Sequence, residues 1–276
     1  MKKYIKFKKI RRIISKTFAI AEKNIQMKMR VKYRILLSYM FPILAILMPI
    51  IVLGKFFDID VRFGPWTSKN YIIFIFIGYN ILLMRGMINL TAVNLMTEKY
   101  WKTLPALITA PFNRFYLLFG YIISEFISIL IPFIVFIIIT LVLFPISLLT
   151  LIVIIIMFLG ISIIFSGTGL LLGVFAISNE NLWSVLDFVV RILFWFSCVT
   201  YPFYLFPNTV QTIIELNPIY YIIDIIRWTW LENNILITAY SHPVHAVMFI
   251  SLLVIFPIIC VYAFNYIYKK LGISGY

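Results

Sequence analysis

The sequence predicts an all-α fold, a polytopic membrane protein built from long apolar helices. Of its 276 residues, 63% are hydrophobic and only 12% are charged. Soluble domains are usually about 45–50% apolar and about 25% charged. Several apolar runs also reach the roughly 20 residues that a helix needs to cross the hydrocarbon layer. These runs do not alternate apolar and polar residues, as the strands of a membrane barrel would. We therefore expect membrane-spanning helices.

The N-terminal segment is strongly basic. Residues 1–34 contain thirteen Lys and Arg against one acid, Glu22, and so carry +12 of the formal net charge of +14. Apolar residues from Phe7 to Ile25 recur at helical spacing, which predicts a cytoplasmic amphipathic helix at the membrane interface. A basic segment can also bind nucleic acid. Because this one runs directly into an apolar span, we expect membrane lipid as its partner and no nucleic acid. A docking role for a protein partner stays open beside simple anchoring.

Residues 35–276 are expected to form a transmembrane domain of six spans. With both termini cytoplasmic, six spans satisfy the preference of Lys and Arg for the inner side of the cell membrane. Residues 207–240 are interrupted by prolines and are predicted to form an outer re-entrant hairpin before the last span. A crossing by residues 218–231 would give seven spans, but this segment is short and charged. The six spans are expected at residues 35–54, 71–95, 115–144, 148–177, 183–206 and 244–268.

Four charged residues fall inside the predicted spans: Arg85, Glu125, Asp187 and Arg191. A charge in the bilayer is costly, so each should pair or face a polar cavity. Asp187 and Arg191 are one helical turn apart and can pair on one face. Arg85 and Glu125 lie at comparable depth on consecutive spans, and we expect them to pair too. A polar lining for a substrate path is the alternative.

The fourth predicted span is rich in small residues on its inner half. Small side chains let membrane helices approach each other closely, so we expect tight packing of this span against a neighbour. The residues concerned are Gly160, Ser162, Ser166, Gly167, Thr168, Gly169 and Gly173.

No catalytic or metal-binding constellation stands out, and we expect no enzymatic activity and no cofactor. His242 and His245 flank a proline, but a metal site needs three or four ligands, and no Cys or acid is near them in sequence. Cys198 and Cys260 lie in apolar runs and are expected to be buried hydrophobic residues. The chain lacks the Gly-x-x-x-x-Gly-Lys-Ser/Thr phosphate-binding motif. If ATP drives its function, another polypeptide must hold the nucleotide.

A short polar and aromatic segment, residues 97–114, separates the second and third spans on the predicted inner side. Tyr100, Trp101 and Leu104 could form a rigid knob that fits a groove on a partner, since aromatic anchors dominate such contacts. A loop that rests on lipid is the alternative.

Two motifs resemble those of type-2 ABC exporter permeases. Residues 98–114, which read Glu-Lys-Tyr-Trp-Lys-Thr-Leu-Pro-Ala-Leu-Ile-Thr-Ala-Pro-Phe-Asn-Arg, are similar to an inner loop with an acid, Gly-Thr-Leu, and Thr-Pro before a basic residue. Lys102 stands where Gly is common, and Ala110 intervenes before Pro111. Residues 215–227, Glu-Leu-Asn-Pro-Ile-Tyr-Tyr-Ile-Ile-Asp-Ile-Ile-Arg, are similar to the family's Leu-Asn-Pro-x-Tyr…(Asp/Glu)-x-x-Arg element.

The resemblance implies a homo- or heterodimer of permease subunits above two ABC ATPase subunits, exporting a substrate by alternating access. The substrate, whether drug, lipid, glycan or ion, stays open. The segment 97–114 would be the coupling helix that contacts the ATPase, and the second motif would cap the exit on the outer side. This assigns ATPase coupling to Glu98, Lys99, Tyr100, Trp101, Lys102, Leu104, Leu107 and Arg114, and an outer gate to Asn217, Pro218, Asp224 and Arg227.

Two other functions fit the composition. An ion-coupled secondary transporter could use Glu125 and Asp187, but such proteins are built from inverted repeats or helices broken at mid-membrane, which the sequence does not display. A membrane anchor that only recruits a partner is the second alternative. Transport without an ATPase would favour the first, and copurification without transport the second.

Overall fold

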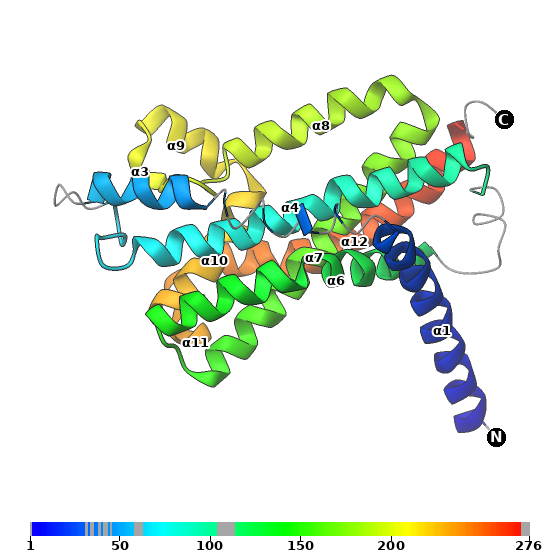
Figure 1. Ribbon diagram of the computed structural model, residues 1–276, viewed down its shortest axis with the longest axis horizontal. Helices are drawn as coiled ribbons and strands as arrows, with labels where there is room; N and C mark the ends of the chain where they lie inside the picture. The colour runs from blue at the N-terminus through cyan, green and yellow to red at the C-terminus, as the bar shows by residue number, and fades with distance from the viewer. Residues whose placement is uncertain are drawn as a thin grey trace.

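Long helices make up nearly all of the regular structure, which was obtained as a computed structural model (Figure 1). The structure describes residues 2–30, 46–57, 63–103 and 114–271, with positions 33, 36, 37, 40 and 44. In these ranges the only strand-like pairing is one bridge between Phe63 and Trp66. The helices are α1 (Lys2–Met29), α3 (Leu47–Phe57), α4 (Tyr71–Tyr100), α6 (Arg114–Leu143), α7 (Leu148–Ser178), α8 (Glu180–Trp195), the 3₁₀ helix η1 (Phe203–Leu205), α9 (Asn208–Glu215), α10 (Pro218–Glu232), α11 (Ile235–Ser241) and α12 (Pro243–Leu271).

Four of the described helices, α4, α6, α7 and α12, are long and apolar enough to cross a membrane, with mean hydropathies between 1.8 and 3.1. They confirm the helical membrane class and correspond to the predicted second, third, fourth and last spans. Seven of the first eleven positions of the predicted first span, residues 35–54, lie outside the described residues, and α8 is only 16 residues long. Six spans and a re-entrant hairpin therefore stay predictions.

The predicted boundaries differ most at the fifth span. We expected it to continue to Phe206, but α8 ends at Trp195, and Cys198 adopts a left-handed backbone conformation with φ 55°. Apolar composition alone could not locate this end. Two smaller differences also appear: α4 continues past Leu95 to Tyr100, and α3 continues past Gly54 to Phe57.

The contact between α4 and α7 depends on glycine. A Cβ atom at Gly169 would lie 2.4 Å from the carbonyl oxygen of Ile88, and one at Gly173 would lie 2.7 Å from Leu95 Cδ1. The clash at Gly169 is with backbone, so a larger side chain there would force the helices apart, whereas at Gly173 the Leu95 side chain would have to move. The prediction that small residues allow close packing here is confirmed.

Helix α1 crosses one end of the bundle, where α4 and α12 also end (Figure 1). We call this the terminal end; α3, α9 and α11 lie at the far end. Thr17, Ala21 and Asn24 are buried where α1 packs on α6, whereas Ile14 and Phe18 are about half exposed, at 51% and 57%. One face of α1 thus packs on the bundle and a neighbouring apolar face stays uncovered, as a helix at a membrane surface requires.

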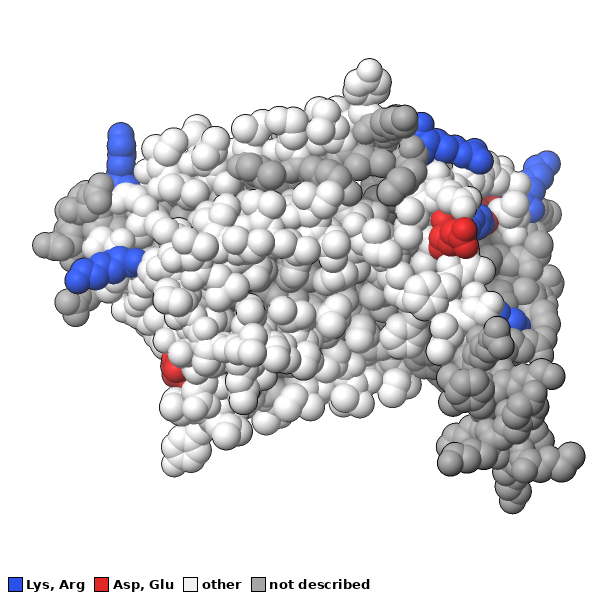
Figure 2. Space-filling model, turned by 60° about the horizontal axis from the view of Figure 1, so that its bottom comes forward, with Lys and Arg blue, Asp and Glu red and all other residues white. Residues whose placement is uncertain are grey.

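Charged residues avoid the middle of the molecule on the face seen in Figure 2. The Lys, Arg, Asp and Glu residues coloured there lie toward its two ends, and the broad band between them is uncharged. Such a band fits the hydrocarbon layer of a bilayer, in which exposed charge is costly.

Candidate functional site

The last turn of α4 ends in a defined cap. The backbone N–H of Lys102 donates to the carbonyl of Lys99 at 2.9 Å, and that of Thr103 donates to the carbonyl of Glu98 at 3.0 Å. Together with a left-handed Lys102, at φ 56°, this is a Schellman motif, in which glycine is the usual left-handed residue. The conformation favours glycine, which is the residue that the resemblance implies at this position. Residues 97–100 of the predicted segment are therefore the last turn of α4, and residues 104–113 lie outside the described residues.

Glu98 lies inside this cap and links it to α1. Its side chain is 4% exposed, forms an ion pair with Lys23 of α1 and accepts a hydrogen bond from the hydroxyl of Thr103. These internal partners show that Glu98 joins α1 to the end of α4. Its contact with an ATPase stays a prediction.

Two aromatic residues stand out from this end of α4. Tyr100 is 62% exposed and Trp101 is 55% exposed, and Lys102 next to them is exposed as well. Lys99 turns back to the bundle, where its Nζ donates to the carbonyl of Ile177 on α7 at 3.2 Å. Of the remaining predicted coupling residues, Leu104 and Leu107 lie outside the described residues, as does the side chain of Arg114, the first residue of α6.

The predicted Asp187–Arg191 pair is present on α8. Arg191 Nε and Nη2 lie 2.8 Å and 2.6 Å from Asp187 Oδ2. The predicted pair of Arg85 and Glu125 is wrong for the residues that the structure describes. Glu125 accepts a hydrogen bond from Asn94 Nδ2 at 3.1 Å, whereas the Arg85 guanidinium lies 5.0 Å from the ring centre of Phe194.

The mismatch has a simple geometric cause. Asn94, which faces Glu125, is nine residues beyond Arg85 on α4, and nine residues of helix span about 13.5 Å. Arg85 thus lies too far along the helix to reach Glu125.

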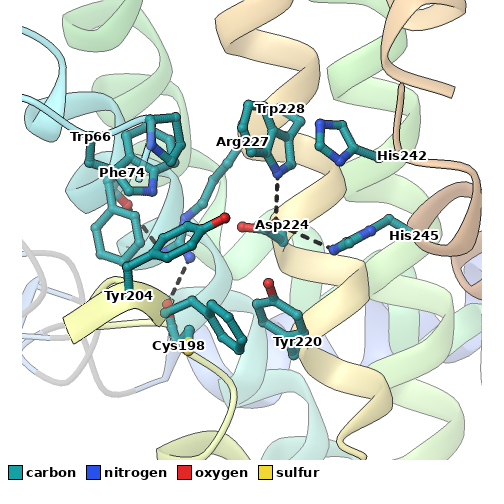
Figure 3. A pocket seen from close by; sticks show the side chains of 12 residues that line it. Trp66, Phe74, Cys198, Tyr204, Tyr220, Asp224, Arg227, Trp228, His242 and His245 are labelled. Carbon is teal, nitrogen blue, oxygen red and sulfur yellow. Dashed lines mark hydrogen bonds and ion pairs between the residues drawn. The ribbon is translucent and has the colours of Figure 1, made fainter. Parts of the chain in front are cut away.

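A cavity of about 90 Å³ lies at the far end of the bundle (Figure 3). Most of its walls are aromatic, and it contains one acid, one arginine and two histidines. Its lining brings together α4, α10, the loop before α4, the segment after α8 and the start of α12. The lining residues are Pro65, Trp66, Phe74, Cys198, Phe203, Tyr204, Tyr220, Asp224, Arg227, Trp228, His242 and His245.

Asn217, from the predicted outer gate motif, joins two helices. Its Oδ1 accepts from the N–H of Ile219 at 3.0 Å and so caps α10, whose first residue is Pro218. Its Nδ2 donates to the carbonyls of Leu193 and Phe196, at 2.6 Å and 2.9 Å. One buried amide thus starts α10 and satisfies two carbonyls at the end of α8.

Arg227, the last residue of the same motif, holds the chain just beyond α8. Its guanidinium donates to the carbonyls of Cys198 and Val199, both at 2.7 Å, and stacks on the Phe74 ring at 3.6 Å. The contact also needs Gly78, because a Cβ there would lie 2.4 Å from the Val199 carbonyl oxygen. Arg227 is fully buried. These bonds account for the early end of α8, since the carbonyls find partners on α10.

Sequence reasoning missed the histidines of this cavity. Asp224 accepts from Trp228 Nε1 at 2.8 Å, and His245 Nε2 lies 3.4 Å from Asp224 Oδ2 (Figure 3). His242 lies 3.6 Å from Glu232 and stacks on Trp228 at 4.1 Å between ring centres. Burial lowers the pKa of His242, although Glu232 acts in the opposite direction. The histidine side chains thus lie against α10 at the start of α12, and only the fold brings them together with these acids.

The chain was next compared with known protein families. The ABC-2 type transporter family model matches residues 16–231, which include α4, α6, α7, α8 and most of α10. The chain belongs to the ABC-2 type transporter family. It is therefore a membrane-embedded permease of an ABC transporter, and this membrane family is not itself catalytic. No curated protein matches the chain.

Proposed function

We propose that this chain is the permease subunit of an ABC exporter, which moves a substrate across the cell membrane by alternating access. A separate ATPase subunit supplies the energy, and a second permease subunit, identical or different, completes the transport path. ABC-2 permeases usually work with an ABC ATPase and dimerise, which supports both partners.

The observation that carries the proposal is the exposed aromatic pair at the end of α4. Tyr100 and Trp101 are exposed on a helix end that is fixed by its cap and by the ion pair between Lys23 and Glu98. Rigid, exposed aromatic side chains suit a groove on a partner, and a rigid helix can transmit movement into the bundle. In this proposal the terminal end faces the cytoplasm, which agrees with the excess of Lys and Arg in residues 1–34.

The test is to copurify the chain with the ATPase encoded nearest to it and to measure ATP hydrolysis with and without the permease. We expect the permease to alter hydrolysis, and Trp101→Ala to abolish most of that effect. Tyr240→Ala is the matched control, because Tyr240 is 90% exposed but lies on α11 at the far end (Figure 1).

Two results would contradict the proposal. If the Trp101→Ala and Tyr100→Ala variants change ATP hydrolysis as much as the unaltered permease does, these two residues do not form the contact with the ATPase. Substrate movement driven by an ion gradient in vesicles that lack the ATPase would favour a secondary transporter.

A further inference from the structure

Arg85 occupies an unusual place for a charged residue. It lies halfway along α4, the 30-residue helix Tyr71–Tyr100, so about 21 Å of helix separates it from either end. In a bilayer with a hydrocarbon layer about 30 Å thick, this position is near the middle. An arginine at that depth marks a functional site unless a carboxylate neutralises it.

The carboxylate of Asp187 is already paired. Asp187 and Arg191 both act electrostatically on Arg85, but the ion-pair contacts to Asp187 Oδ2 come from Nε and Nη2 of Arg191. Among the described residues, no carboxylate lies within ion-pair distance of Arg85. Within the described part of the chain, Asp187 is therefore bound by Arg191, and the guanidinium of Arg85 has no carboxylate partner.

The surroundings suit the anionic end of an amphipathic molecule. The Arg85 guanidinium rests against Phe194, which is buried and packs on Phe165 of α7. Arg191, with a side chain 54% exposed, opens toward the outside of α8. Phe188 and Trp195, which are 55% and 69% exposed, flank it. Arg191 thus lies beside two exposed aromatic side chains of its own helix.

We infer that Arg85 and Arg191 form a binding site for a phosphate or carboxylate group, and that the transported substrate is an anionic amphiphile. The planar guanidinium fork matches both groups, and charge-assisted hydrogen bonds are strong away from water. The aromatic residues of α8 would cover the apolar part of the ligand. The term substrate rests on the proposed transport function; the anion site does not.

The test measures binding to the purified full chain in nanodiscs of phosphatidylcholine, without an ATPase. The probes are short-chain phosphatidic acid, short-chain phosphatidylcholine and inorganic phosphate. We expect saturable binding of phosphatidic acid that Arg85→Gln weakens at least tenfold. Asp187→Asn should tighten it several-fold, because this change releases Arg191. Lys69→Gln, which removes an exposed charge at the far end, is the control and should have no effect.

The outcomes separate the possible ligands. Binding of inorganic phosphate as tight as that of phosphatidic acid supports the anion site and identifies a free anion, not an amphiphile, as its ligand. Equal binding of phosphatidylcholine, or unchanged binding in both Arg85→Gln and Asp187→Asn, would overturn the inference. Asp187→Asn keeps both arginines and tests the site even if Arg85→Gln does not fold. Because no ATPase is present, these results are independent of the Trp101 experiment.

Discussion

At the scale of single residues, two polar side chains, one at the N-cap of α10 and one within it, bind the backbone carbonyls at the end of α8. The last carbonyls of a helix have no partner within it, and in a membrane protein water does not always reach them. Asn217 and Arg227 together donate to the carbonyls of Leu193, Phe196, Cys198 and Val199. Asn217 and Arg227 of the second motif therefore fix the end of α8 and the residues after it against α10.

Replacing Asn217 by aspartate should destabilise the protein by about 2–4 kcal/mol. The carboxylate keeps the oxygen that caps α10 but loses the donor to Leu193 and Phe196, and it places a charge beside two carbonyl oxygens. Unfolding of the purified protein in a denaturing detergent would measure the change. Asn208→Asp is the control, because Asn208 is exposed in the first turn of α9, where a negative charge is favourable. Equal stability of the two variants would contradict the role of the amide.

The sequence revealed these residues only in part. Proline after asparagine at residues 217 and 218 is a recognisable helix start, and the structure has a helix that begins there. The carbonyls that Asn217 binds are more than twenty residues earlier, and no local pattern identifies them. Lys102 is similar: the resemblance implies glycine at this position, but only the left-handed backbone, with φ 56°, gives a reason for glycine there.

At the scale of helices, the seam between α4 and α7 brings two backbones into direct contact. Replacing Gly169 by alanine should cost about 1–3 kcal/mol, since overpacking of a fitted contact has a cost of this size, and the new Cβ would overlap the Ile88 carbonyl. The same unfolding assay would measure it.

The matched control is Gly86→Ala, also in a helix of this bundle. A Cβ at Gly86 meets no other atom within 4 Å, so the change should stabilise α4 by about 0.5–1 kcal/mol through its lower conformational entropy when unfolded. We therefore expect Gly169→Ala to lower the free energy of unfolding and Gly86→Ala to raise it. If both variants gain stability, the two helices are not in close contact at Gly169.

Helix prediction succeeded where apolar runs are long and uninterrupted. The predicted spans 115–144 and 148–177 differ from α6 and α7 by a single residue at each differing end. It failed at α8, because residues 196–206 are as apolar as the helix before them and their turn depends on partners from α10. The predicted pairing of Arg85 with Glu125 was also wrong. Position in the sequence does not show which residue of α4 lies opposite Glu125, and in the structure that residue is Asn94.

For the whole molecule, the ion pair of Lys23 with Glu98 joins α1 to the end of α4, beside the exposed aromatic residues. In the proposed mechanism, a push on Trp101 must move α4 and α1 together. The sequence predicted a basic helix at the membrane surface, but it did not indicate that this helix is tied to the end of α4.

The two partners of this ion pair should respond unequally to substitution. Lys23→Met leaves the buried Glu98 without its counter-ion and should cost about 2 kcal/mol, because stranding a buried charge is more costly than losing an exposed one. Glu98→Gln keeps a hydrogen-bonding side chain beside Thr103 and leaves Lys23, whose side chain is 41% exposed, free to reach water, so about 1 kcal/mol is expected.

Combining both changes tests whether the contact acts as a unit. The double variant should be no less stable than Lys23→Met alone, because the contact is already lost in either single variant. Both single variants should also reduce the effect of the permease on ATP hydrolysis while Trp101 stays in place. Additive losses of stability, together with normal coupling in all three variants, would show that α1 is an anchor only and that force enters the bundle through α4 alone.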